Sequence, residues 1–116
     1  MECRRGEVYI ADLDPVLGSE QGARRPVVII QNDVGNKYSP TTIVASVTSQ
    51  VSDKVYPTEV RVKSGMGGLN KKSTILLNQI KTIDKRRLER RLGQFDDEVI
   101  QKVNEAIMIS LSLIAI

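Results

Sequence analysis

A polar loop with two glycines, one carboxylate and two adjacent arginines runs directly into an apolar segment, residues 27–30. The loop reads Gly18-Ser19-Glu20-Gln21-Gly22-Ala23-Arg24-Arg25-Pro26. Pro26 biases the backbone of Arg25 towards an extended conformation, so the guanidinium is expected to project from the mouth of a strand. A planar, permanently charged fork in that position suits a phosphate. On spacing alone, a hairpin loop with a solvated arginine pair explains the same residues.

The composition narrows the chemistry that this loop can take part in. The chain has no histidine and a single cysteine, Cys3. It therefore lacks the commonest metal ligand and neutral-pH proton shuttle, and it has no disulfide framework or cysteine-rich zinc site. Aromatic residues make up 3% of the chain, which argues against a base-stacking platform. We expect no metal and no cofactor. The net charge of +3 favours a polyanionic partner if the positive charge is localised.

Short β-branched or alternating segments separated by turn-forming residues predict a mainly β fold. The expected strands are residues 7–13, 26–31, 41–48, 57–63 and 73–80. Residues 32–36 are dense in turn formers, and residues 64–68, with three glycines, are typical of a mobile loop. Residues 83–88 can begin a helix capped by Asp84, whereas residues 88–95 fit either a helix or a strand.

A terminal helix is predicted after Phe95. Asp96 is the expected N-cap, acidic residues follow in the first turn, and Phe95 can pack on Ile100 as a hydrophobic staple. One face is marked by Val99, Val103, Ala106, Ile107, Ser110 and Ile114. The last turns are apolar nearly all round, so they are expected to lie in a core or against a second copy. The elements together predict one domain, a small antiparallel barrel or curved sheet with a helix packed on it.

Nothing in the chain predicts a targeting or membrane segment. Charged residues interrupt the N-terminal stretch, with no apolar run after them. The apolar C-terminal run is far shorter than the roughly 20 residues that a membrane span needs. We expect a cytoplasmic protein.

Several segments, in order along the chain, resemble the MazF/PemK toxin family. They are Arg5-Gly6-Glu7-Val8-Tyr9, Asp12-Leu13-Asp14-Pro15, Gly18-Ser19-Glu20-Gln21-Gly22, Arg25-Pro26-Val27-Val28, Gln31-Asn32-Asp33, residues 44–48 and Leu77-Asn78-Gln79-Ile80-Lys81-Thr82-Ile83. The resemblance implies an SH3-like barrel of the MazF/PemK/CcdB type with a C-terminal helix, as one domain over residues 1–116. It also implies a homodimer, a MazE-like antitoxin as partner, and sequence-specific, metal-independent cleavage of single-stranded mRNA.

The same resemblance assigns site residues. Arg25 and Thr48 match the catalytic pair, and Ser19, Glu20 and Gln21 match the residues that line the RNA groove. Asn32 and Gln79 match positions near the scissile site. Lys81, at the start of a basic cluster, joins them as an RNA-binding candidate. The cluster comprises Lys81, Lys85, Arg86, Arg87, Arg90 and Arg91, and it is either a solvated face or a surface for RNA phosphates or an acidic antitoxin tail.

The reaction that the resemblance implies is attack by the substrate's own 2′-OH on the adjacent phosphorus. The products are a 2′,3′-cyclic phosphate and a 5′-OH. Arg25 can stabilise the charge on the phosphorane oxygens, and Thr48 can hold a phosphate oxygen or the attacking hydroxyl. Arginine is a poor base, so we expect Arg25 to act as a clamp and possible acid. Glu20 is the first candidate base; the alternative for Glu20 is a salt bridge to Arg24 or Arg25.

Two other functions fit the same predicted fold. One is a binding module that occupies RNA or a protein without cutting it, and the other is a CcdB-like poison of a DNA topoisomerase. Because functions are grafted onto shared folds, the fold does not separate them. Arg25-Pro26, Thr48 and the Gly18–Gln21 motif favour the nuclease.

Overall fold

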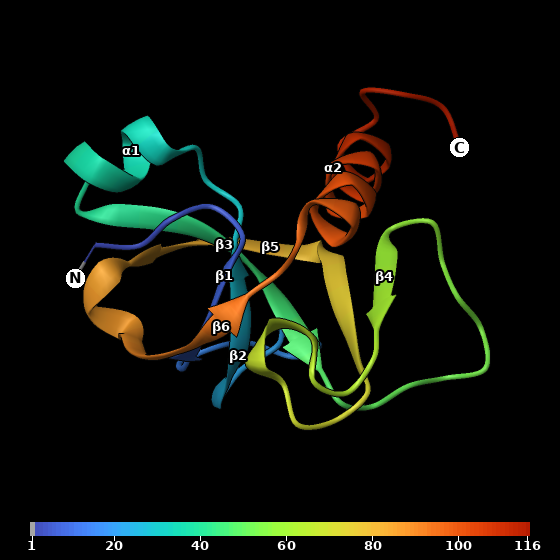
Figure 1. Ribbon diagram of the computed structural model, residues 1–116, viewed down its shortest axis with the longest axis horizontal. Helices are drawn as coiled ribbons and strands as arrows, with labels where there is room; N and C mark the ends of the chain where they lie inside the picture. Colours follow the sequence, from blue (N-terminus) through green and yellow to red (C-terminus); the bar gives the residue numbers. More distant parts are fainter. Residues whose placement is uncertain (1) are drawn as a thin grey trace.

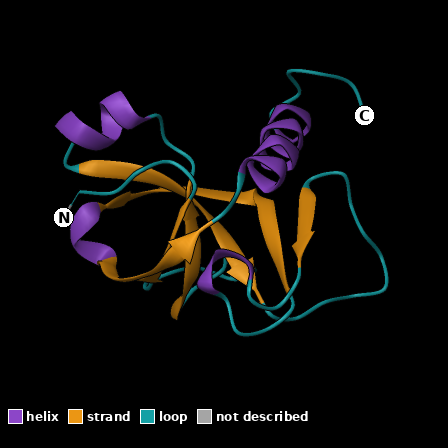
Figure 2. Cartoon of the chain, viewed as in Figure 1, coloured by secondary structure: helices purple, strands orange, loops and turns teal. Residues whose placement is uncertain are grey.

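A six-stranded antiparallel sheet forms most of the molecule (Figures 1 and 2). The computed structural model describes residues 2–116. The strands are β1 (Glu7–Asp12), β2 (Arg24–Ile29), β3 (Thr41–Thr48), β4 (Glu59–Val62), β5 (Ser73–Asp84) and β6 (Leu88–Gln94). The helices are α1 (Asp33–Tyr38), α2 (Asp97–Ser110) and two short 3₁₀ turns, η1 (Met66–Gly68) and η2 (Lys85–Arg87). The strand order across the sheet is β4-β5-β3-β2-β1-β6, so the predicted mainly β fold with a C-terminal helix is confirmed.

Both faces of the curled sheet carry buried apolar side chains. Side chains alternate across a strand, and the neighbours Val8 and Tyr9 of β1 accordingly enter two different apolar clusters. The cluster that contains Val8 also receives α2, through Val99, Val103 and Ala106. These three residues lie on the face of α2 that its 3.6-residue period predicts. Ile114, predicted on the same face, instead follows the end of the helix at Ser110 and is exposed.

The N-terminus of α2 also forms as predicted. The Asp96 side chain accepts a hydrogen bond from the Val99 amide at 3.0 Å, and both Phe95 and Ile100 pack into the same cluster. The end of the chain is different, because Leu111, Leu113 and Ile116 remain exposed. In residues 2–116, no helix combines the length and the apolar character that crossing a membrane requires.

The glycine-rich segment at residues 64–68 is packed against β6, which corrects the expectation of a mobile loop. Gly67 is buried in η1, and a Cβ on Gly68 would lie 2.0 Å from the Leu92 carbonyl oxygen. The glycines are therefore required by close backbone approach and by positive φ angles of 63° and 76°. This contact brings the β4–β5 connection against the opposite edge of the sheet.

Three other segments differ from their expected form or resolve an ambiguity. Residues 32–36 were expected to be a turn, but Asn32 caps the short helix α1 by accepting from the Gly35 amide at 2.8 Å. Asp84 does cap a helical segment, but only the single turn η2, because residues 88–94 continue as β6. Strand β5 runs to Asp84 rather than to Ile80, and a register shift opposite Ala45 and Ser46 accommodates its length.

Candidate functional site

The site begins where β2 and β3 separate. Their antiparallel pairing ends at Val27, opposite Ser46, and the next residue of β2 is Pro26, which has no N–H to donate to a ladder. Each further step back along β2 corresponds to one step forward along β3. Continued in this way, the register sets Arg25 opposite Thr48. Both residues thus lie just beyond the last pair of this ladder, where the two strands have separated.

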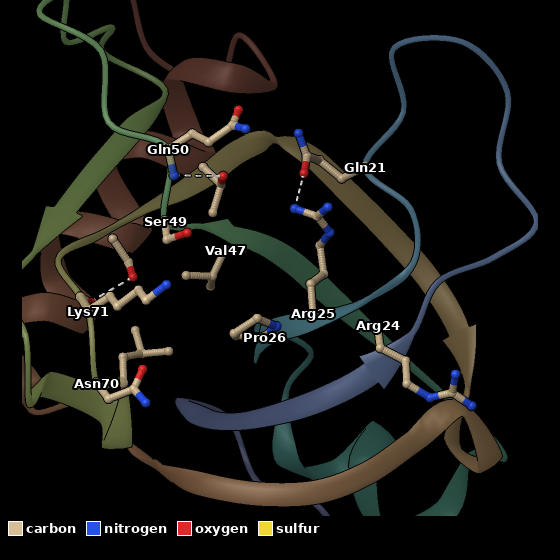
Figure 3. A pocket seen from close by; sticks show the side chains of 12 residues that line it. Gln21, Arg24, Arg25, Pro26, Val47, Ser49, Gln50, Asn70 and Lys71 are labelled. Carbon is tan, nitrogen blue, oxygen red and sulfur yellow. Dashed lines mark hydrogen bonds between the residues drawn. The ribbon is translucent and has the colours of Figure 1, made fainter.

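An open cavity of about 460 Å³ occupies this gap. Gln21, Arg25 and Pro26 line it from the β1–β2 loop and β2, and Val47 and Thr48 line it from β3. Figure 3 shows the side chains of Arg25, Pro26 and Val47 around this space. The β4–β5 connection closes a third side with Asn70 and Lys71. The cavity therefore brings a guanidinium and a hydroxyl to one open space.

Arg25 is half-buried and held in one orientation. Its Nε donates to the Gly22 carbonyl at 2.6 Å, and its Nη1 donates to Gln21 Oε1. A guanidinium has five N–H groups, so both hydrogens of Nη2 and the second hydrogen of Nη1 stay available to a ligand. The loop thus fixes the orientation of the guanidinium and leaves three of its N–H groups available to a ligand.

Thr48 is also half-buried, at the last position of β3. Its Oγ1 accepts a hydrogen bond from the Gln50 amide at 3.1 Å. Because the hydroxyl acts there as an acceptor, its own hydrogen is free to donate to an anionic oxygen.

The neighbouring Arg24 has a different environment from Arg25. Its side chain points away from Arg25 (Figure 3), and its Nε donates to Glu89 Oε2 at 2.9 Å. This hydrogen bond raises the pKa of Arg24. The period-two alternation of a strand therefore sends the two guanidiniums in different directions. Both residues border the cavity, but the Arg24 guanidinium forms an ion pair with Glu89 of β6.

Glu20 lies in a second, smaller cavity of about 170 Å³, together with Gln79 and Lys81. Gln21 borders both cavities, and its amide donates to Gln79 Oε1 at 3.3 Å. The Glu20 carboxylate accepts from the Leu17 amide at 3.0 Å. Within residues 2–116, Glu20 forms no salt bridge with either arginine of the loop, so the ion-pair alternative does not describe its position.

The remaining candidates lie farther from Arg25 and Thr48. Ser19 is exposed on the β1–β2 loop, residues 13–23, and lines neither cavity. Asn32 uses its side chain to cap α1 and is also outside both cavities. Lys81 borders the second cavity, with its Nζ donating to the Leu13 carbonyl at 3.2 Å.

Sequence reasoning missed five polar residues of the larger cavity: Ser49, Gln50, Asn70, Lys71 and Ser73. Lys71 and Lys72 together come directly before Ser73, where a predicted strand begins. A basic pair at the mouth of a strand is the same signal that singled out Arg24 and Arg25.

Most cations of the basic cluster are bound by groups of the protein itself. Lys85 donates to the Asn36 carbonyl, Arg91 pairs with Glu7 at 2.6 Å, and Arg86 pairs with Asp84 at 3.0 Å. The Arg86 side chain lowers the pKa of Asp84 to about 2. These contacts favour a structural role for much of the cluster.

Known proteins match this chain over nearly its whole length. The family described as PemK-like, MazF-like toxin of type II toxin-antitoxin system matches residues 4–111. Endoribonuclease EndoA of Bacillus subtilis (strain 168) is 53% identical over 114 residues, which cover 98% of either chain. A crystal structure of MazF from Deinococcus radiodurans has a TM-score of 0.83 at 24% identity, covering 97% of this chain and 98% of that one. A mycobacterial endoribonuclease in complex with its cognate antitoxin has a TM-score of 0.80 at 23% identity, covering 98% and 99%.

Proposed function

This chain belongs to the PemK-like, MazF-like family of type II toxin–antitoxin toxins, and from that premise we propose that it is an endoribonuclease acting on single-stranded mRNA. The observation that carries the proposal is the shared cavity of Arg25 and Thr48 at the separated ends of β2 and β3. The relative with 53% identity is named an endoribonuclease. The site of action is the cytoplasm, where mRNA is available.

The scissile phosphate lies between Arg25 and Thr48. The 2′-oxygen of the preceding nucleotide forms a bond to phosphorus while the bond from phosphorus to the 5′-oxygen breaks. The products are a 2′,3′-cyclic phosphate and a 5′-OH. The three free N–H groups of Arg25 stabilise the negative charge that gathers on the phosphorane oxygens, and a preorganised donor of this kind is typically worth about 10²–10³ in rate. The Thr48 hydroxyl donates to a phosphate oxygen beside it. Since Arg25 supplies the positive charge that stabilises these oxygens, the reaction proceeds without a metal.

Proton transfer divides between Arg25 and a separate base. Arg25 donates the proton that the leaving 5′-oxygen needs, while Glu20 is the candidate acceptor for the 2′-OH proton. The Glu20 carboxylate lies in the adjacent cavity, with Gln21 between the two. Catalytic contacts often tighten only when substrate is bound, and closure of the loop on RNA brings Glu20 towards the 2′-oxygen. A Glu20→Gln variant that keeps the wild-type rate and pH profile would remove Glu20 from this role.

Base recognition is assigned to the second cavity. Gln21 and Gln79 present amide donors and acceptors that match the edges of unstacked bases, and single-stranded RNA is read mainly through such edges. Ser19 and Lys81 lie along the same loop and rim, and Asn32 is kept as a more distant contact.

The test is incubation with a long RNA in the presence of EDTA, followed by mapping of the ends. Discrete cuts with 5′-OH termini support the proposal, and Arg25→Ala serves as the matched inactive control. Intact RNA that nevertheless binds the protein would indicate a binding module. Intact RNA together with stabilised gyrase–DNA cleavage complexes would indicate a topoisomerase poison.

Two protein partners complete the proposal. A homodimer covers three exposed apolar residues near the end of the chain, Leu111, Leu113 and Ile116. Sedimentation analysis of the wild type and of Leu113→Asp tests this dimer. An antitoxin of the MazE type binds the dimer; one mycobacterial structural relative is described in complex with its cognate antitoxin. Co-purification with a small acidic protein encoded nearby tests this partner.

A further inference from the structure

The two ends of the β1–β2 loop are tied together by a set of hydrogen bonds that the reaction itself does not use. The Asp14 carboxylate accepts from the Ala23 amide at 2.8 Å, and the Leu13 amide donates to the Ala23 carbonyl at 3.1 Å. Ala23 has a φ of 60°, a left-handed conformation that is unfavourable for a residue with a Cβ. Both main-chain polar groups of Ala23 are thus bound by the opposite end of the loop.

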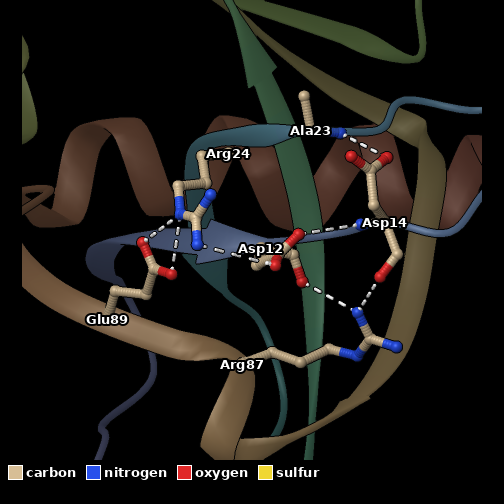
Figure 4. Close-up of polar contacts among 6 residues, drawn as sticks. All are labelled: Asp12, Asp14, Ala23, Arg24, Arg87 and Glu89. Carbon is tan, nitrogen blue, oxygen red and sulfur yellow. Dashed lines mark hydrogen bonds and ion pairs between the residues drawn. The ribbon is translucent and has the colours of Figure 1, made fainter.

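The two ends of the β1–β2 loop, residues 12–14 and 22–23, are called the neck of the loop below. Arg87 of η2 contacts this neck. Its Nη1 donates to the Asp12 carbonyl at 3.0 Å and also to the Asp14 carbonyl (Figure 4). Lys81 of β5 binds the Leu13 carbonyl between them, at 3.2 Å. Three successive carbonyl groups at the end of β1 are therefore bound by cations from other elements.

The neighbouring glycine shows how closely the two ends approach. A Cβ built on Gly22 would lie 2.6 Å from the Asp14 carboxylate and 2.5 Å from the Val16 side chain. The Gly22 carbonyl is also the acceptor for Arg25 Nε. The neck is consequently only one residue away from the cavity that holds the proposed reaction.

The tip of the loop has little support of its own. Leu17 is 81% exposed, and Gly18, Ser19 and Glu20 are exposed as well. Segments with few buried contacts and solvent-exposed hydrogen bonds open at low free energy. The position of Gln21, which touches Arg25 and Gln79, therefore depends on the neck being closed.

We propose that Asp14 and Arg87 are positioning residues, which hold the β1–β2 loop in the conformation that binds RNA. This inference rests on the proposed nuclease function. Because the two residues act through the loop and contact no reacting atom, their loss reduces the fraction of protein that can bind productively. The apparent dissociation constant then rises by the inverse of that fraction, while the rate of the bound complex is kept.

The first test is steady-state cleavage of one defined RNA oligonucleotide. Losing one solvent-exposed hydrogen bond, which water weakens to about the strength of a neutral one, corresponds to about a 2- to 10-fold change in the ratio of closed to open loop. We therefore expect Asp14→Ala and Arg87→Ala to raise KM by up to that factor and to leave kcat within about twofold. Asp14→Asn retains the acceptor oxygen and should restore KM. Arg86→Ala removes the same charge next door without touching the loop, and it should keep the wild-type KM. An equal fall in kcat at unchanged KM, or equal effects of Arg86→Ala and Arg87→Ala, would overturn the proposal.

The second test does not depend on nuclease activity. The chain has no tryptophan, so Leu17→Trp places a single tryptophan, which is excited separately from the tyrosines, at the exposed tip of the loop. Time-resolved anisotropy should show a larger fast component when Asp14→Ala is added, and the wild-type decay with Asp14→Asn. Identical anisotropy decays in all three proteins would refute the positioning role of Asp14 even if RNA is cleaved. A changed decay in a protein that cleaves no RNA would instead refute the proposed function alone.

Discussion

Replacing Arg25 by lysine separates the effect of charge from the effect of the fork. Two of the five N–H groups of the guanidinium are occupied by Gly22 and Gln21, which leaves three for the phosphate. A lysine presents one nitrogen, so it cannot keep the loop contacts and hold two phosphate oxygens together. We expect Arg25→Lys to lower the cleavage rate about 10²- to 10³-fold, equivalent to about 2.7–4 kcal/mol of transition-state stabilisation.

The assay is single-turnover cleavage of a fluorescent RNA oligonucleotide with enzyme in excess, which isolates the chemical step from product release. Arg90→Lys, the same change at an exposed position of β6, is the matched control and should retain the wild-type rate. Thermal unfolding of both variants checks that each is folded. A rate for Arg25→Lys within about threefold of wild type would show that any cation suffices, and the clamp mechanism would be wrong.

Three further predictions concern the hydroxyl, the packed turn and acid stability. Thr48→Ala should slow cleavage about tenfold, the loss of one hydrogen bond to the transition state, with an unchanged melting temperature; an unfolded variant would make Thr48 structural instead. Gly68→Ala should cost about 2 kcal/mol or more in urea unfolding, because its Cβ would meet the Leu92 carbonyl at 2.0 Å. Gly65→Ala, with a similar positive φ but nothing within 4 Å, should cost about 1–2 kcal/mol from strain alone. Asp84 has a pKa lowered from 3.8 to about 2 by Arg86, so its contribution to stability is complete above pH 3.8 and is lost as the pH falls towards 2. The difference in melting temperature between wild type and Asp84→Asn should therefore disappear over that interval; a constant difference would contradict it.

The elements that sequence reasoning predicted well are those in which local pattern and burial agree. Residues 41–48 are β-branched and form β3 over the same range. The Asp96 cap and the apolar face of α2 follow from spacing alone, since a cap is a contact within one helical turn.

The errors arose where the deciding contact is remote in sequence. Gly67 and Gly68 were interpreted as a source of mobility, yet they are required by the side chain of Phe95 and the backbone of Leu92. Residues 88–95 fit the period of a helix and that of a strand equally well. Their pairing with β1 makes residues 88–94 a strand. No local pattern contains either contact.

The candidate site was only partly predictable for a similar reason. The resemblance paired Arg25 with Thr48, and the structure brings both into one cavity. The role of Asp14 and Arg87 at the neck was not predicted, because their partners are main-chain groups, which every residue carries. Lys71 enters the cavity through a connection whose path depends on how the sheet curls.

The end of pairing between β2 and β3 has a consequence for how this protein can change over time. Arg25 and Thr48 owe their juxtaposition to the sheet register, whereas Gln21 and Glu20 owe theirs to the segment inserted between β1 and β2. A change of sequence at the exposed tip of that segment, residues 17–19, can give the molecule a new preference among RNA words while Glu20 and the residues that hold Arg25 stay in place. Selectivity and bond breaking are in this sense two separately editable parts of one small protein.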